Sequence, residues 1–204
     1  MMNGRKSKGV REDALTAATA QFAERGFHGV SLAQIAASLG VSKQAVLHHY
    51  ASKEKLYAEV LASIAKDYEA LVAQARDSAR DPQQQFEKLF ELLLQASQQS
   101  HPHSKLLMRE LLDVGTRAEN PGKWYLKPFL DELQSMGAAL TAWTEKSDSE
   151  VFAAIYQLIG AISYFAISQE TIAGMYGPRQ KAQINRAFTE EFLGSVRTLT
   201  AASE

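Results

Sequence analysis

Apolar residues recur along this chain at spacings of three and four, which is the period of an α-helix with one buried face. Two clear examples are Leu15, Ala18 and Phe22, and later Phe86, Leu89, Phe90 and Leu93. No run of alternating β-branched residues is long enough to indicate a strand. The pattern therefore predicts an all-α fold.

Residues typical of helix ends divide this pattern into about nine helices. Ser31 with Gln34 has the spacing of a capping box, Ser42 and Ser52 are candidate N-caps, and Gly26 fits the left-handed position after a helix. The predicted helices span about 10–25, 31–40, a short stretch after 42, 52–77, 82–99, 104–117, 122–145, 149–174 and 179–201.

Composition excludes several classes of site. The chain has no cysteine, so disulfides, thiolate metal sites and cysteine nucleophiles are excluded, which fits a reducing cytoplasm. Residues 1–60 carry a balance of +3, whereas the remainder carries −4, so the N-terminal quarter is the candidate for binding a polyanion. The first ten residues lack a secretory apolar segment, and the most apolar stretch, 151–167, falls short of the roughly 20 residues of a membrane span. We expect a cytoplasmic protein that does not enter a membrane.

Residues 31–50, SLAQIAASLGVSKQAVLHHY, have the pattern of two short crossed helices. The apolar positions Ile35, Leu39, Val41 and Val46 are spaced to form their contact, and Gly40 makes the turn. On the second helix the opposite face carries the polar side chains of Lys43, Gln44, His48 and His49. Packing within a protein core does not require such a face. In a DNA-reading helix, Lys can pair with guanine O6 and N7, and Gln can pair with adenine. A helical hairpin within a core is the alternative interpretation.

The segment GVSLAQIAASLGVSKQAVLHHYASKEKLY resembles the N-terminal motif of tetracycline-repressor (TetR) type regulators over about residues 10–60. The resemblance implies a helix-turn-helix domain at 1–55 and a helical effector-binding and dimerisation domain at 56–204. It assigns Ser42, Lys43, Gln44, Ala45, Leu47, His48 and His49 to the reading helix, and Lys53 to a phosphate contact. Leu47 departs from the family, which most often has an aromatic residue there. Ser31 and Ser52 begin helices whose free N–H groups could hold a phosphate, or are simply solvated caps.

The resemblance also implies repression of transcription, a palindromic double-stranded operator and a small-molecule effector. A homodimer is expected because one reading helix contacts few bases, and because the two C-terminal helices carry apolar residues on more than one face. The candidate effector pocket contains aromatic and Met residues that together indicate an apolar or aromatic ligand, although core packing is the better explanation for any single one: Tyr68, Phe90, Met108, Trp124, Tyr125, Phe129 and Tyr156.

Other functions leave weaker signals in the sequence. The basic segment containing Arg5, Lys6, Lys8 and Arg11 is interpreted as a disordered arm that follows DNA, or as a solubilising tail. His101 and His103 could supply half of a metal site, but no third ligand is evident, so no metal or cofactor is predicted. No histidine has Glu three residues before it, which argues against a di-iron bundle enzyme, and no other catalytic motif is found. A helical protein-interaction adaptor without DNA binding remains the alternative.

Overall fold

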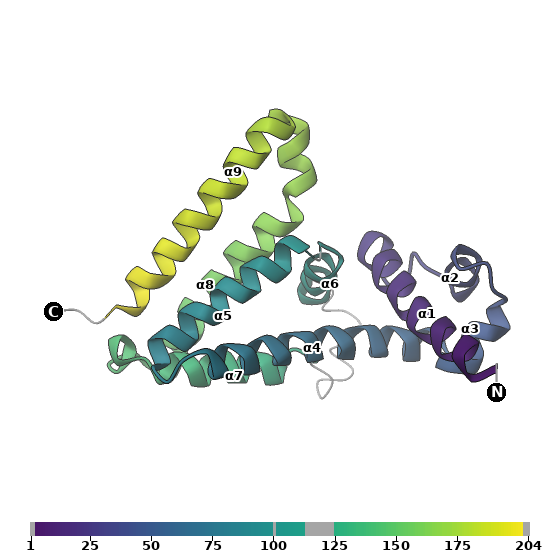
Figure 1. Ribbon diagram of the computed structural model, residues 1–204, viewed down its shortest axis with the longest axis horizontal. Helices are drawn as coiled ribbons and strands as arrows, with labels where there is room; N and C mark the ends of the chain where they lie inside the picture. The colour runs from purple at the N-terminus through teal and green to yellow at the C-terminus, as the bar shows by residue number, and fades with distance from the viewer. Residues whose placement is uncertain (1–2, 100, 113–124, 202–204) are drawn as a thin grey trace. The chain divides into compact units, whose positions relative to one another are not determined.

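The computed structural model describes residues 3–99, 101–112 and 125–201, except for the side chains of 3–8, 101, 111 and 112. These ranges contain nine α-helices, one 3-10 helix and no strand (Figure 1), which confirms the predicted all-α fold. The helices are α1 (Asn3–Arg25), α2 (Leu32–Ser38), α3 (Lys43–Tyr50), α4 (Lys53–Ser78), α5 (Pro82–Gln99), α6 (His101–Leu112), α7 (Lys127–Ala138), η1 (Thr141–Trp143), α8 (Asp148–Ile167) and α9 (Gln169–Thr200).

The helices form two compact units that interleave along the chain. The first unit contains α1, α2, α3, the part of α4 up to Ala65, and α6. The second contains the rest of α4, α5, α7, η1, α8 and α9. Helix α4 therefore contributes residues to both units.

The first unit is built around the buried stripe of α1. Ala14, Ala18 and Phe22 lie one turn apart and are fully buried, and the two alanines allow neighbouring helices to approach closely. Ile35 of α2 and Val46 of α3 are also fully buried, as the apolar contact predicted between these helices requires. Because α2 and α3 are too short to persist alone in water, they depend on this packing against α1.

The second unit has a larger, aromatic core. Phe86 and Phe90 of α5 are fully buried, and the ring of Phe86 meets the edge of Trp143 at a centroid distance of 5.3 Å. The indole Nε1 of Trp143 donates to the Leu199 carbonyl of α9 at 2.7 Å. A Cβ on Gly137 of α7 would lie 2.9 Å from Val151 of α8, so glycine is needed where these two helices pack. This core joins α5, α7, α8 and α9.

Two of the predicted helices are divided in the structure. The helix predicted over 122–145 ends at Ala138, because Leu140 adopts an extended backbone and turns with Trp143 into the core. The helix predicted over 149–174 ends at Ile167, where the hydroxyl of Ser168 bonds the Tyr164 carbonyl at 2.7 Å and competes with the helical backbone. The break predicted near Pro178 is confirmed by Gly177, whose φ of 76° interrupts α9.

Candidate nucleic-acid interface

The turn between α2 and α3 is fixed by local hydrogen bonds. The Ser31 hydroxyl accepts from the Gln34 N–H at 3.2 Å, and the Gln34 side chain accepts from the Ser31 N–H at 2.8 Å, so the predicted capping box is confirmed. The Ser42 hydroxyl accepts from the Ala45 N–H at 3.2 Å and begins α3. Gly40 has a φ of 66°, which is the left-handed conformation that the turn requires. The turn therefore sets the direction of α3.

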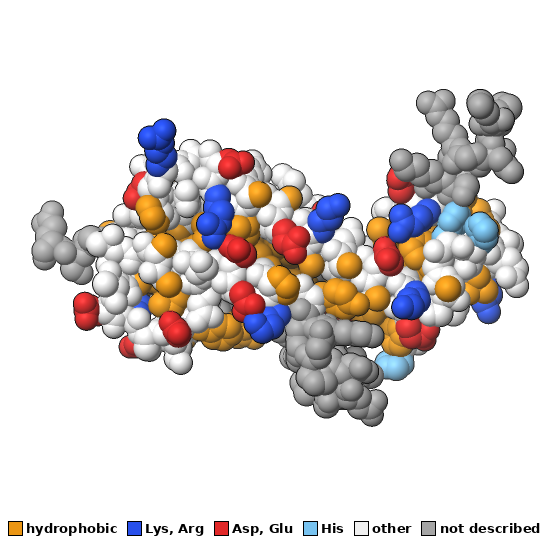
Figure 2. Space-filling view, turned by 90° about the horizontal axis from the view of Figure 1, so that it is seen from below, with side chains coloured by type: hydrophobic (Ala, Val, Ile, Leu, Met, Phe, Trp, Pro, Cys, Tyr) orange, Lys and Arg blue, Asp and Glu red, His pale blue; other side chains and the backbone are white. Residues whose placement is uncertain are grey.

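Helix α3 has one buried side and one exposed polar side. Val46 and Tyr50 are buried against α1 and α2, whereas Ala45, Leu47 and His49 are half-buried. The exposed side chains are those of Ser42, Lys43, Gln44 and His48. The imidazoles of His48 and His49 meet edge to face at a centroid distance of 5.3 Å. Figure 2 shows histidine side chains near Lys and Arg side chains on the surface of the first unit. The outward polar face predicted for α3 is thus present.

The N-terminal turns of α2 and α3 are electrostatically suited to phosphate. Neither first turn contains an acidic residue, so the positive end of each helix dipole is left uncompensated. Helix α4 differs, because the Glu54 carboxylate accepts from its own backbone N–H and from the Ser52 hydroxyl, which lowers the pKa of Glu54. The Ser52 hydroxyl also accepts from the Lys55 N–H at 3.2 Å. The Glu54 carboxylate is therefore the anion at the N-terminus of α4, which suits this helix end less well to a phosphate.

Lys53 at the start of α4 is held in a defined position. Its ammonium lies over the ring of Phe27, 4.2 Å from the centroid, in a cation–π contact. Phe27 in turn packs against Tyr57 and stacks with Phe22 of the α1 core. A lysine ordered in this way loses less side-chain entropy when it contacts a phosphate. The family resemblance implied a phosphate contact for Lys53, but the sequence did not predict the cation–π contact with the Phe27 ring.

The basic segment at the N-terminus is not the disordered arm proposed from the sequence. Helix α1 begins at Asn3, seven residues before the predicted start at Val10, so the backbone of this segment is helical. Arg11 pairs with Glu59 of α4 at 3.3 Å, and its guanidinium lies 5.7 Å from the centre of the Tyr50 ring. The Tyr50 hydroxyl donates to the Arg11 carbonyl at 2.6 Å. These contacts hold α1, α3 and α4 together.

Helix α6 is attached to the C-terminal end of α1. The Arg109 guanidinium donates from Nε to the Ala23 carbonyl at 2.9 Å and from Nη2 to the Glu24 carbonyl at 2.8 Å. Lys105 pairs with the Glu24 carboxylate at 2.6 Å, and this ammonium lowers the pKa of Glu24. The buried Glu110 accepts a hydrogen bond from the Tyr57 hydroxyl of α4. We call Lys105, Arg109 and Glu110 with these partners the α6 latch.

The residues predicted to line an effector pocket are divided between the two units. Phe90 and Phe129 are buried in the second core, with Tyr68 packed against it. Met108 is half-buried on α6 and Tyr125 is half-buried, both in the first unit, whereas Trp124 lies outside the described residues. Tyr156 is 46% exposed on α8 of the single chain, and its assignment to the pocket stays a prediction. Tyr68 and Phe129 remain as a contacting pair, with ring centroids 4.9 Å apart.

Helix α8 presents an exposed apolar face. Phe152, Tyr156 and Tyr164 are 40%, 46% and 70% exposed, and the first two rings stack at 5.6 Å. In the described part of the chain, α8 alone is long and apolar enough to span a membrane by length and composition, with a mean hydropathy of 1.6. Gly160 lies on the same face, where an added Cβ would meet nothing within 4 Å. This face is the candidate surface for a second copy of the chain.

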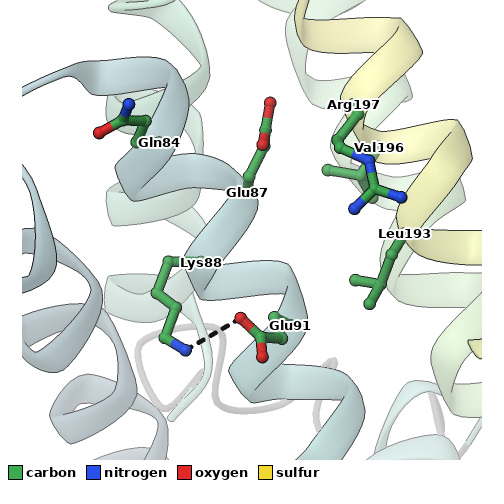
Figure 3. Close-up of a pocket in the computed structure, with 7 residues that line it drawn as sticks. All are labelled: Gln84, Glu87, Lys88, Glu91, Leu193, Val196 and Arg197. Atoms are coloured by element: carbon green, nitrogen blue, oxygen red, sulfur yellow. Dashed lines mark hydrogen bonds and ion pairs between the residues drawn. The ribbon is translucent and has the colours of Figure 1, made fainter.

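Two surface grooves lie in the second unit. The groove between α5 and α9 has a volume of about 390 Å³, and Figure 3 shows side chains of both charges around it. Lys88 pairs with Glu91 there at 2.9 Å, and Glu87 accepts from the Thr200 hydroxyl at 2.9 Å, so much of this polar lining is already bonded. The groove between α4 and α7 has a similar volume of about 400 Å³ but a more apolar lining: Glu69, Val72, Ala73, Arg76, Pro128, Phe129 and Glu132.

No metal site is formed by the side chains that the structure describes. They contain no group of three or more His, Asp or Glu residues arranged to hold an ion. His103 lies in the first turn of α6 rather than in the loop between the predicted helices, and the side chain of His101 is outside the described set.

On α9 the Asn185 Oδ1 atom is buried and receives no hydrogen bond from described residues.

The chain is similar in sequence to known regulators. Residues 14–60 match the family described as bacterial regulatory proteins, tetR family. The transcriptional regulator RutR of Escherichia coli K12 is 30% identical over 145 residues, which cover 70% of this chain and 66% of RutR. The transcriptional repressor KstR2 of Mycobacterium tuberculosis H37Rv is 31% identical over 91 residues, covering 45% of this chain and 46% of KstR2. These named relatives are regulators of transcription, not enzymes.

Solved structures share the fold. The ketosteroid transcriptional regulator KstR2 of M. tuberculosis has a TM-score of 0.67 at 21% identity, covering 96% of both chains. The fatty acid degradation regulator FadR of Bacillus halodurans has a TM-score of 0.64 at 17% identity, covering 92% of this chain and 96% of FadR. At these identities the likeness concerns the fold alone.

Proposed function

The chain belongs to the tetR family of bacterial DNA-binding regulatory proteins, and we propose that it is a homodimeric, cytoplasmic repressor released from a palindromic operator by a small molecule. Residues 1–55 would bind DNA, and residues 56–204 would bind the effector and dimerise. The observation that carries this proposal is the exposed polar face of α3, whose opposite side is buried. No catalytic activity, metal or cofactor is part of it.

Base recognition is assigned to α3, with Lys43 and Gln44 donating to base edges in the major groove. Ala45 and Leu47 are short apolar groups that suit the thymine methyl or a sugar, and His48 and His49 extend the polar face toward the C-terminal end of α3. Phosphates on either side would contact the N-terminal turns at Ser31 and Ser42, and Lys53. A single helix-turn-helix of this size contacts too few base pairs to specify one site in a genome. We therefore propose that a dimer reads two half-sites.

Alanine at Lys43 and at Lys53 should have different consequences for DNA binding. Lys43→Ala removes a base contact, so discrimination should relax at one position of each half-site by about 1–3 kcal/mol. Lys53→Ala removes a phosphate contact, so all sequences should weaken alike and the salt slope should fall by about one per subunit. Fluorescence anisotropy with single-base operator variants at several salt concentrations measures both effects.

Lys66→Ala is the matched control, because Lys66 is an exposed lysine of α4 in the second unit. It should leave both the base preference and the salt slope unchanged. An unchanged base preference in Lys43→Ala would remove Lys43 from the reading set. A salt-dependent gel shift with genomic fragments separates this function from a protein-interaction adaptor, which would show no sequence preference.

We propose that the α6 latch carries the state of the effector domain to the DNA-binding helices. Helix α6 follows α5, a core helix of the second unit, and its Arg109 caps the free carbonyls at the end of α1. Charge-assisted hydrogen bonds of this kind contribute about 1.5–3 kcal/mol. An effector that shifts α6 would therefore alter the support of α1.

Arg109→Ala should loosen α1 and lower operator affinity severalfold, with faster hydrogen exchange at the amides of 22–26. The exposed Arg80 offers a matched control, and Arg80→Ala should leave both quantities unchanged. Wild-type exchange rates in Arg109→Ala would show that the latch does not support α1. Exchange measured by mass spectrometry, with operator titrations alongside, makes this test.

A further inference from the structure

Two side chains of opposite charge lie unpaired on opposite sides of the groove between α5 and α9. The Glu87 carboxylate comes from α5 and the Arg197 guanidinium from α9, and Figure 3 shows no bond joining them. Among the described residues, none hydrogen-bonds or pairs with the Arg197 guanidinium. Its five N–H donors are therefore available to a ligand.

Glu87 is held in place by groups that do not neutralise its charge. Its Oε1 atom accepts from the Gln83 amide at 2.9 Å and from the Thr200 hydroxyl at 2.9 Å. Thr200 is buried on α9, so this bond fixes the carboxylate between the two helices. Both donors are uncharged, and no described residue bonds the other oxygen, Oε2. The ordered carboxylate thus keeps one oxygen for a cationic group.

The other two charges of the groove neutralise each other. Lys88 pairs with the Glu91 Oε2 atom at 2.9 Å, and the Glu91 Oε1 atom accepts from the Gln95 amide at 3.0 Å. The groove is therefore left with one anion on α5 and one cation on α9. A ligand with a single charge would leave one of them without a counter-ion, whereas a zwitterion would contact both.

The groove also has an apolar side. Val196 is buried and Leu193 is half-buried, and both lie on α9 beside Arg197. The volume of about 390 Å³ lies within the range of small-molecule sites, roughly 300–1,000 Å³. An apolar group lying on these two side chains would exclude water and strengthen the neighbouring charge contacts. The lining therefore suits a small molecule with one zwitterionic end and one apolar end.

We propose that the α5–α9 groove binds a free α-amino acid with an apolar side chain. Its carboxylate would accept from the Arg197 guanidinium, and its ammonium would donate to the Glu87 Oε2 atom. Its side chain would lie on Leu193 and Val196. None of the residues predicted for the effector pocket lines this groove, and binding here requires no DNA. The site is therefore additional to the proposed function and is tested independently of it.

The test compares L-phenylalanine with two analogues that each lack one charge. The analogue 3-phenylpropionate lacks the ammonium, and 2-phenylethylamine lacks the carboxylate. The full chain should bind L-phenylalanine about five- to tenfold more tightly than either analogue, which is the effect of one charged hydrogen bond in a partly exposed groove. Titrations followed by saturation-transfer NMR of the ligand measure the three affinities.

Substitution by glutamine assigns each charge to its residue. Arg197→Gln should bind L-phenylalanine about five- to tenfold more weakly than wild type, and should bind 2-phenylethylamine at least as well. Glu87→Gln should show the same loss for L-phenylalanine, and should bind 3-phenylpropionate at least as well as wild type. Arg186→Gln is the matched control, because Arg186 is an exposed arginine of α9 outside the groove. Its three affinities should equal those of wild type.

Thermal unfolding separates a loss of binding from a loss of folding. Since no described residue bonds the Arg197 guanidinium, Arg197→Gln should unfold at the same temperature as wild type. Equal affinity of wild type and Arg197→Gln for L-phenylalanine would overturn the inference. Equal affinity of wild type for all three ligands, or no saturable binding of L-phenylalanine up to its solubility limit, would also contradict it.

Discussion

Tyr156→Arg is expected to give a monomer whose operator affinity is lower by at least about 100-fold. Tyr156 is 46% exposed and stacks on Phe152 on the apolar face of α8, so a dimer formed there would bury both rings. In a dimer formed through this face, each new arginine would be desolvated without a counter-ion. A lone reading helix then retains mainly non-specific affinity, which is typically weaker than specific affinity by about 10³ or more.

Sedimentation and operator titration of the same samples measure this prediction. The variant should keep its helical content in the monomeric state, because Tyr156 contributes little to the core of one chain. Glu145→Arg, an exposed substitution outside α8, serves as the control and should remain a dimer. If Tyr156→Arg sediments as a dimer and binds the operator normally, the α8 face is not the interface.

Phe86→Ala should destabilise the chain by about 3–5 kcal/mol. The side chain is fully buried, lies 4.8 Å from the Phe90 ring and meets Trp143 at its edge, so truncation leaves a cavity between α5 and η1. For a chain of this length the Tm should fall by roughly 10 °C. Trp143 is 2% exposed, and its fluorescence reports on the same site.

Unfolding by urea, followed through tryptophan fluorescence and circular dichroism, tests the Phe86 prediction. Gln99→Ala is the control on the same helix, because the Gln99 side chain is exposed and its truncation should cost about 0.5 kcal/mol or less. A loss below about 1 kcal/mol for Phe86→Ala would mean that Phe86 is not central to this core.

The predictions that succeeded from sequence concern interactions between residues close together in the chain. The capping box at Ser31, the cap at Ser42 and the left-handed turn at Gly40 each depend on neighbours within a few positions. The polar face of α3 followed from helical period alone, since burial of Val46 leaves Lys43 and Gln44 on the other side. Interactions between neighbouring residues therefore determine both the turn and the outward polar face of α3.

The features that sequence reasoning missed depend on contacts between distant residues. Arg109 bonds carbonyls 85 and 86 residues earlier, and a lone arginine on an amphipathic helix gives no sign of such partners. The exposure of Tyr156 was not predicted, because composition marks an aromatic residue without showing which side of α8 faces the core. Ser168 ends α8 through a bond to its own helix, which resembles an ordinary helical serine in sequence.

The most direct test of the central claim is selection of DNA from a random pool by the full-length protein, followed by sequencing. The account predicts an inverted repeat whose half-sites lie about one helical turn or more apart, and selection by Lys43→Ala should lose one conserved position in each half. Recovery of no enriched sequence, or of a single unrepeated half-site, would contradict a dimer that reads DNA through α3.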